Sequence, residues 1–286
     1  MSTSRSPWLW VQWLIAGFLC LHSLPAKADL MLFPTRVVFE GDQRSAQVEL
    51  VNQGKTPETS RISVVNRRMG ESGEFLVITE PGPGEQFAEA MLRYSPRQVT
   101  IPAGSSQTVR ILLRKPADLA PGEYRSHLQF DRVADASGSN SVEQLGQDKA
   151  GGVGVVLSAL VGASIPVIVR HGDTESKVSL DKLAWQPAAS RGDNSPPAIA
   201  FDIHRDGNRS VYGDLSVSFT PKVGIPIELA KASGVAVYTP NALRHARIPL
   251  SLPDGTVLAG GVVRVSYRER AESGGKLLAE STLAMP

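Results

Sequence analysis

The sequence predicts an all-β protein built from two antiparallel β-sandwich domains. Most segments after Asp29 are short runs that alternate apolar and polar residues or are rich in Val and Ile, and turn signals containing Gly, Pro or Asn separate them. No segment shows a convincing helical period, so a sandwich is the expected fold class. The chain has 286 residues, of which 42% are hydrophobic and 20% charged, which suits two domains of about 100–150 residues each.

The first 28 residues have the features of an export signal. Arg5 provides an early positive charge, residues 6–25 are uncharged, and Ala26-Lys27-Ala28 fits the small-x-small rule for cleavage. We therefore expect a cleaved signal peptide at 1–28 and a mature chain that works in the periplasm. The alternative is a membrane anchor. A lipoprotein signal is excluded because Leu19, and not a small residue, precedes Cys20.

Cysteine content and net charge exclude further kinds of site and partner. Cys20 is the only cysteine and leaves with the signal, so the mature chain has no disulfide and no thiolate site. Arg5 and Lys27 also leave with it, and the remaining basic residues then equal the 28 acidic residues. A net charge of zero gives no field for nucleic acid.

The first half contains a series of predicted strands. They lie at 35–40, 47–52, 61–66, 74–79, 97–101, 107–113 and 124–133. In the second of these, Val48 and Leu50 are expected on one face. The run Pro121-Gly122-Glu123-Tyr124 before the last strand is typical of the tyrosine corner of Ig-like domains, in which the Tyr hydroxyl bonds back to the backbone.

A polar connection at 134–152 leads to an uncharged stretch that ends at Val169. Its length also fits a transmembrane helix, but it contains several glycines and Pro166, and its bulky residues are mostly Val and Ile, which favour a strand. As a strand it places one apolar set on a single face: Val153, Val155, Leu157, Ala159 and Val161.

A second β pattern follows a short hinge at 171–173. Its predicted strands lie at 178–185, 198–204, 214–220, 227–229, 235–238, 246–252, 262–270 and 276–283. The expected domains are therefore 29–171 and 174–286.

The sequence contains no pattern for catalysis or for a cofactor. The histidines of the mature chain, at 127, 171, 204 and 245, are isolated from one another and have no Cys partner. There is no nucleophile elbow, no Walker loop and no dinucleotide fingerprint. We therefore expect a protein that is not an enzyme and that holds no metal and no cofactor, although ligands scattered along a chain can still meet in a fold.

Three segments together resemble the PapD-like family of pilus-assembly chaperones. The mature chain opens with Phe33-Pro34-Thr35-Arg36-Val37-Val38-Phe39, and Pro102-Ala103-Gly104 leads into a strand, as in that family. Ile165-Pro166-Val167-Ile168-Val169-Arg170 resembles the end of its G1 strand. Pro121-Gly122-Glu123-Tyr124-Arg125 is similar to the archaic, spore-coat-U branch.

The resemblance implies a fold and a mechanism. Two Ig-like sandwiches would form an L or boomerang, and the chaperone would complete a pilus subunit by donor-strand complementation and deliver it to an outer-membrane usher. The donor residues would be those at 153, 155, 157, 159 and 161. The implied partners are pilus subunits and the usher, without nucleic acid or stable membrane insertion. The chaperone bound to its subunit would be monomeric.

The resemblance also assigns roles to arginines. Arg36 matches the family residue that binds the C-terminal carboxylate of the subunit, and Arg170 matches a residue of an interdomain charge network. The second anchor of the family is a Lys, and Pro166 takes its place here. Arg125 is our candidate for the missing charge. The alternatives are a solvated Arg36 and donor residues that only fill the chain's own core.

Two other functions compete with the chaperone. A secreted fimbrial subunit or adhesin with two Ig-like modules would polymerise, whereas a chaperone forms one-to-one complexes. A carbohydrate-binding module or hydrolase would need an aromatic platform, but aromatic residues make up only 6% of the chain and only Trp185 of the four tryptophans follows the signal.

Overall fold

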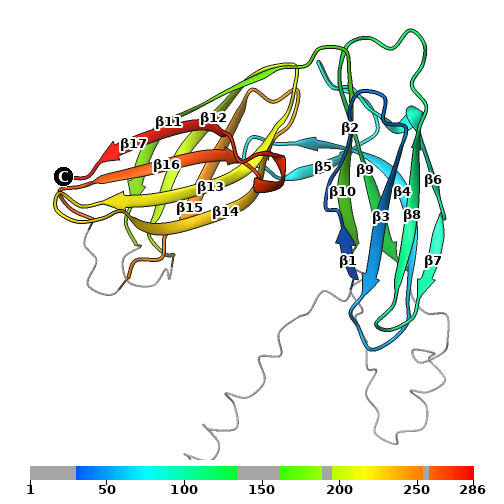
Figure 1. Ribbon diagram of the computed structural model, residues 1–286, viewed down its shortest axis with the longest axis horizontal. Helices are drawn as coiled ribbons and strands as arrows, with labels where there is room; N and C mark the ends of the chain where they lie inside the picture. Colours follow the sequence, from blue (N-terminus) through cyan, green and yellow to red (C-terminus); the bar gives the residue numbers. More distant parts are fainter. Residues whose placement is uncertain (1–29, 134–161, 189–194, 254–257) are drawn as a thin grey trace, which may run out of the picture.

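A computed structural model describes residues 30–133, 162–188, 195–253 and 258–286. These residues form two β-sandwiches whose long directions cross, so the molecule is L-shaped (Figure 1). The expected all-β class and the expected L arrangement are confirmed. The signal peptide and the donor residues at 153–161 lie outside the described residues, and the structure does not test the domain boundaries at 28/29 and 171/174.

The first sandwich consists of two sheets. One has the order β1-β3-β8-β6, and the other has the order β2-β10-β9-β4-β5, with β7 also pairing with β4. The strands are β1 Leu30–Phe33, β2 Val37–Phe39, β3 Ser45–Asn52, β4 Glu58–Met69, β5 Phe75–Ile78, β6 Leu92–Ser95, β7 Gln98–Ile101, β8 Ser106–Leu113, β9 Gly122–Arg132 and β10 Ala163–His171, with a 3-10 turn at Glu89–Met91.

The second sandwich also consists of two sheets. A three-stranded sheet has the order β11-β12-β15, and a four-stranded sheet has the order β14-β13-β16-β17. The strands are β11 Ser176–Gln186, β12 Ala198–Gly207, β13 Val211–Thr220, β14 Ile227–Val237, β15 Leu243–Pro249, β16 Val262–Glu269 and β17 Leu277–Ala284, with a 3-10 turn at Ala271–Ser273. No helix in the described parts of the chain is long and apolar enough to cross a bilayer.

The alternation of apolar residues decides which face of each strand is buried. Val48 and Leu50 of β3 are both fully buried in the first core, as their spacing predicts. Tyr124 of β9 donates its hydroxyl hydrogen to the carbonyl oxygen of Ala120 at 2.9 Å, which confirms the predicted tyrosine corner.

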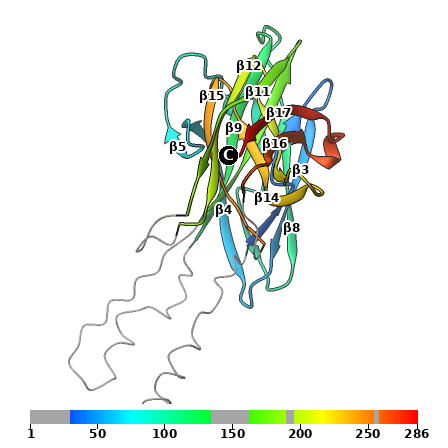
Figure 2. The same cartoon turned by 90° about the vertical axis from the view of Figure 1, so that its left-hand side faces the viewer.

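Strand β10 contributes to both cores. Val167 and Val169 pack in the core of the first sandwich, whereas Ile168, which points the other way, packs in the core of the second. The strand is paired on both sides, in parallel with β2 and antiparallel with β9. The β4–β5 hairpin also reaches the second sandwich (Figure 1), where Asn241 donates a side-chain hydrogen bond to the carbonyl oxygen of Met69 at 2.8 Å. Figure 2, seen from the C-terminal side, shows β5 and β8 on opposite sides of the molecule.

Several strand predictions were incomplete or wrong. Strands β1 and β6 were not expected, and β2 pairs in parallel with β10 within a fold expected to be antiparallel. The segments 227–229 and 235–238 were expected as two strands but lie in the single strand β14 and just after it. The register of β14 against β13 shifts twice. Gly234, with φ near 71°, sits at one irregularity, where its N–H donates to Asp214 Oδ1 at 2.8 Å. Gly234, which falls between the two expected strands, therefore marks a bulge within one long strand.

Candidate functional site

The site begins with two arginines that converge on one aromatic ring. Arg36 lies between β1 and β2, and Arg125 lies in β9 opposite Ile168 of β10. Their guanidinium carbons lie 5.7 Å and 4.4 Å from the ring centroid of Tyr238, which follows β14 in the second sandwich. The structure thus brings together the two residues that the sequence analysis named as anchors, at the junction of the two sandwiches, and we call this junction the arginine cleft.

Both guanidiniums have buried donors without acceptors. The Nε and Nη1 atoms of each arginine are buried and have no hydrogen-bond partner among the described residues. Arg125 does donate from Nη2 to the carbonyl oxygen of Arg67 at 3.2 Å. The Arg36 guanidinium also stacks over Tyr212, at 4.5 Å from the ring centroid. Burial is the main cause that lowers the pKa of both arginines, but a guanidinium stays protonated in proteins.

The nearest carboxylates are already occupied. Glu123 accepts a hydrogen bond from Arg170 Nε at 3.0 Å and another from the backbone N–H of Ser210 at 3.2 Å. Glu85 forms a two-pronged pair with Arg68, at 2.7 and 2.8 Å. The positive charges of the arginine cleft are therefore not neutralised by a direct ion pair among the described residues.

The network around Glu123 joins the two sandwiches. Arg170 bonds to Glu123 of β9 and also to Glu40, which follows β2. The hydroxyl of Ser210, beside β13, donates to Glu123 and accepts from the backbone N–H of Thr239 at 3.0 Å. Arg170 therefore belongs to a polar network that reaches from the first sandwich to the second through Glu123.

Three aromatic side chains line the cleft next to Arg125. The rings of Phe75 and His127 meet edge to face with centroids 5.2 Å apart, and Phe75 lies 5.9 Å from Tyr238. Burial, followed by the charges of Arg125 and Arg67, lowers the pKa of His127 to about 3. The imidazole is therefore neutral and forms part of an apolar wall beside the two cations. Pro166, at the place of the family Lys, is paired with His127 across β10 and β9.

Sequence reasoning did not find Phe75, Tyr212 or Tyr238. They come from three segments distant in the chain, and two of them belong to the second sandwich. A single Tyr at a strand end is ordinary, so no local signal marks these residues as part of a site. The five donor residues at 153, 155, 157, 159 and 161 lie outside the described residues, so the structure does not locate them.

Comparisons with known proteins gave matches among solved structures only. No family model matches the chain, and no curated protein matches it. The chain is similar to the YadV chaperone, with a TM-score of 0.44 and 12% identity over 90% of this chain and all of that one. It is also similar to the CupB2 chaperone of Pseudomonas aeruginosa, with a TM-score of 0.40 and 12% identity over 89% of this chain and 99% of that one.

A further match is the CsuC–CsuE complex of a chaperone and a tip adhesion subunit, from the archaic chaperone-usher Csu pili of Acinetobacter baumannii. Its TM-score is 0.46 at 13% identity, over 90% of this chain and 98% of that one.

Proposed function

We propose that this protein is a periplasmic chaperone of a chaperone-usher pathway. It binds the free C-terminal carboxylate of a pilus subunit in the arginine cleft, completes the subunit fold by donating its segment 153–161, and delivers the subunit to an outer-membrane usher. It acts by binding and not by catalysis. The observation that carries this proposal is that Arg36 and Arg125 each have two buried guanidinium nitrogens without an acceptor among the described residues.

A carboxylate supplies the hydrogen-bond acceptors that the arginine cleft lacks. A buried donor left without an acceptor costs about 1–3 kcal/mol, and each of the two guanidiniums has two such nitrogens. A carboxylate offers two oxygens that accept charge-assisted bonds from guanidinium forks. The cleft is rigid on both sides, because Arg125 lies within a paired strand and Arg36 stacks on Tyr212.

Among the residues that the structure describes, no acidic side chain pairs with Arg36 or Arg125, which favours an anion from outside. Glu123 and Glu85 are engaged by other groups. A terminal carboxylate fits better than an internal Asp or Glu because the cleft lies where the two sandwiches meet, and a client chain that ends there need not pass through the junction. The proposed completion of the subunit fold is supported by the sequence at 153–161, where apolar residues alternate with the period of a donated strand.

Co-purification tests the proposal. The chain, carrying a Strep tag, is purified from the periplasm of its native host, and the co-eluting proteins are identified by mass spectrometry. We expect a one-to-one complex with a protein whose Ig-like fold lacks a strand. Peptides with the last residues of that partner are then compared as free acid and as amide. Arg36→Ala and Arg125→Ala should each weaken binding of the acid about thirtyfold or more, the equivalent of about 2 kcal/mol for a lost buried charge pair.

Arg97→Ala is the matched control. Arg97 also stacks on a tyrosine, with its guanidinium 5.1 Å from the Tyr94 ring centroid, but lies next to β7 and outside the cleft. It should leave binding unchanged. Equal affinity for acid and amide would refute the carboxylate site. Self-polymerisation without a one-to-one partner would instead favour the fimbrial subunit.

A further inference from the structure

A second cluster of ionisable side chains lies on the outer face of the three-stranded sheet. Along β12, Ile199, Phe201 and Ile203 face the core of the second sandwich, so Asp202 and His204 face outward. Asp202 pairs directly with Asp181 of β11 on one side and with His245 of β15 on the other. Four side chains with metal-binding atoms therefore share one face across three neighbouring strands.

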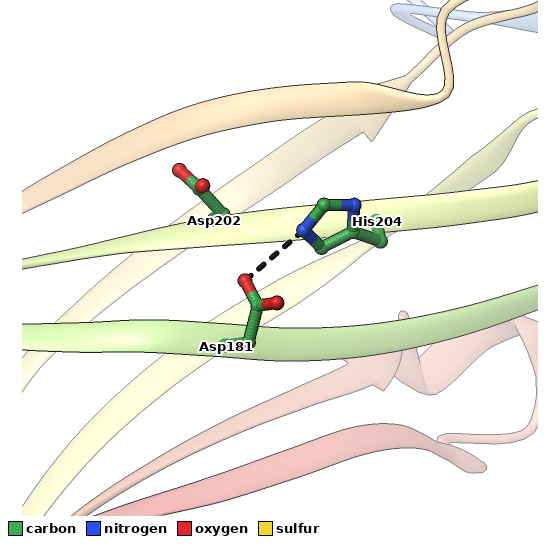
Figure 3. A group of neighbouring side chains, drawn as sticks. All are labelled: Asp181, Asp202 and His204. Atoms are coloured by element: carbon green, nitrogen blue, oxygen red, sulfur yellow. Dashed lines mark hydrogen bonds and ion pairs between the residues drawn. The ribbon is translucent and has the colours of Figure 1, made fainter.

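Three of these four residues place their ligand atoms close together. One ligand atom from each of Asp181, Asp202 and His204 lies within 4.8 Å of the other two. Figure 3 shows His204 and Asp181 turned toward each other, with Nε2 and Oδ1 3.0 Å apart. The Nδ1 atom of His245 lies 2.6 Å from Asp202 Oδ1. Asp202 thus links His245 to the other two residues, and imidazole nitrogens and carboxylates are the kinds of ligand that suit Zn²⁺.

The register of the sheet favours a positive charge here. Like charges directly opposite each other on neighbouring strands destabilise a sheet, and Asp181 is directly opposite Asp202. The side chain of Lys182 now supplies a positive charge, with Nζ 2.9 Å from Asp202 Oδ2. That side chain is 70% exposed, and its residue sits at a bulge with φ near 51°. A flexible and exposed ammonium is easily displaced by a divalent ion.

The other nitrogen of His245 has the partner expected of a metal ligand. Histidines that bind a metal through one nitrogen usually donate the other N–H to a carboxylate. The Nε2 atom of His245 lies 3.4 Å from Glu71 Oε2. Glu71 belongs to the turn between β4 and β5 of the first sandwich, and its carbonyl oxygen accepts the backbone N–H of His245 at 2.7 Å.

We propose that Asp181, Asp202, His204 and His245 bind one Zn²⁺ ion, which displaces the ammonium of Lys182. Through His245 and Glu71, the ion holds the β4–β5 turn of the first sandwich against β15 of the second. This site is independent of the proposed chaperone function. The spacing in the sequence gave no sign of it because the ligands come from three different strands.

Zinc titration of the mature chain tests the proposal. Protein with a Strep tag, stripped with a chelator, is titrated with Zn²⁺ by calorimetry and melted with and without the ion. We expect one ion per chain and a higher melting temperature. His204→Ala and Asp181→Asn should each weaken binding about tenfold or more, whereas Lys182→Ala should strengthen it. Co²⁺ should give visible absorption bands that the His204→Ala variant lacks.

His171→Ala is the matched control, since His171 ends β10 and lies outside the cluster. It should bind Zn²⁺ like the wild type. Circular dichroism of each metal-free variant verifies that it is folded. Failure of the wild type to bind Zn²⁺ overturns the proposal, as does binding that the Asp181 and His204 variants leave unchanged.

Discussion

Buried His127 should make the protein lose stability in mild acid. Its side chain is 2% exposed, and burial with the nearby charges of Arg125 and Arg67 lowers its pKa from 6.5 to about 3. Between these values the unfolded chain binds a proton that the folded chain does not. The free energy of unfolding therefore falls as the pH drops below 6.5, and this loss continues until the pH approaches 3.

The size of the effect follows from the two pKa values. At pH 5 the unfolded imidazole is almost fully protonated while the folded one is still neutral, so His127 alone should lower the free energy of unfolding by about 2 kcal/mol relative to pH 7. Substitution by Gln, which does not titrate, should remove this loss. The comparison needs only the change between the two pH values, so any effect of His127→Gln at pH 7 cancels.

Urea unfolding followed by circular dichroism at pH 7 and pH 5 measures the effect. Other groups also titrate. The pKa of His245 is raised, chiefly by its hydrogen bond to Asp202, so its stabilisation is present at low pH and is lost as the pH rises. The lowered pKa values of Glu40 and Glu85 matter below about pH 4.5. Both proteins share these groups, so they cancel. If wild type and His127→Gln lose equal stability between pH 7 and pH 5, the reasoning is wrong.

Three further predictions concern single contacts. Arg170→Ala should destabilise the protein by about 3–5 kcal/mol in calorimetry because it leaves the buried Glu123 carboxylate without its ion pair; a change below 1 kcal/mol would contradict this. Tyr124→Phe removes the bond to Ala120 and should cost about 0.5–1.5 kcal/mol in urea unfolding, and an unchanged midpoint would show that the bond contributes nothing. Phe75 is 39% exposed, so Phe75→Ala should clearly weaken client binding while it changes the melting temperature only a little. A large fall in melting temperature with unchanged client binding would count against a binding role.

Local patterns predicted most of the strands but only part of the site. The strand with Val48 and Leu50 and the corner at Tyr124 could be predicted because each depends on neighbours in the sequence. The break expected between 227–229 and 235–238 was wrong, because Gly234 lies at a bulge within a single long strand.

The arginine cleft depends on contacts between distant segments. Arg36 and Arg125 were named because of a family resemblance and a strand position, but the tyrosines that position them come from the second sandwich. The Asp and His cluster also depends on which strands become neighbours. A single sequence does not determine such pairings, because its periodicity gives the face of a residue and not the strand beside it.

The two faces of β10 pack in different cores, which restricts how this strand can move. A slip by a single residue would turn Ile168 into the first sandwich and expel both valines from it, so the packing fixes the register of β10. The core of the second sandwich contains Met69 and Ile168 of the first, so the second sandwich has no intact core on its own. We therefore expect the two halves to melt together in one cooperative transition, as a single-domain protein would.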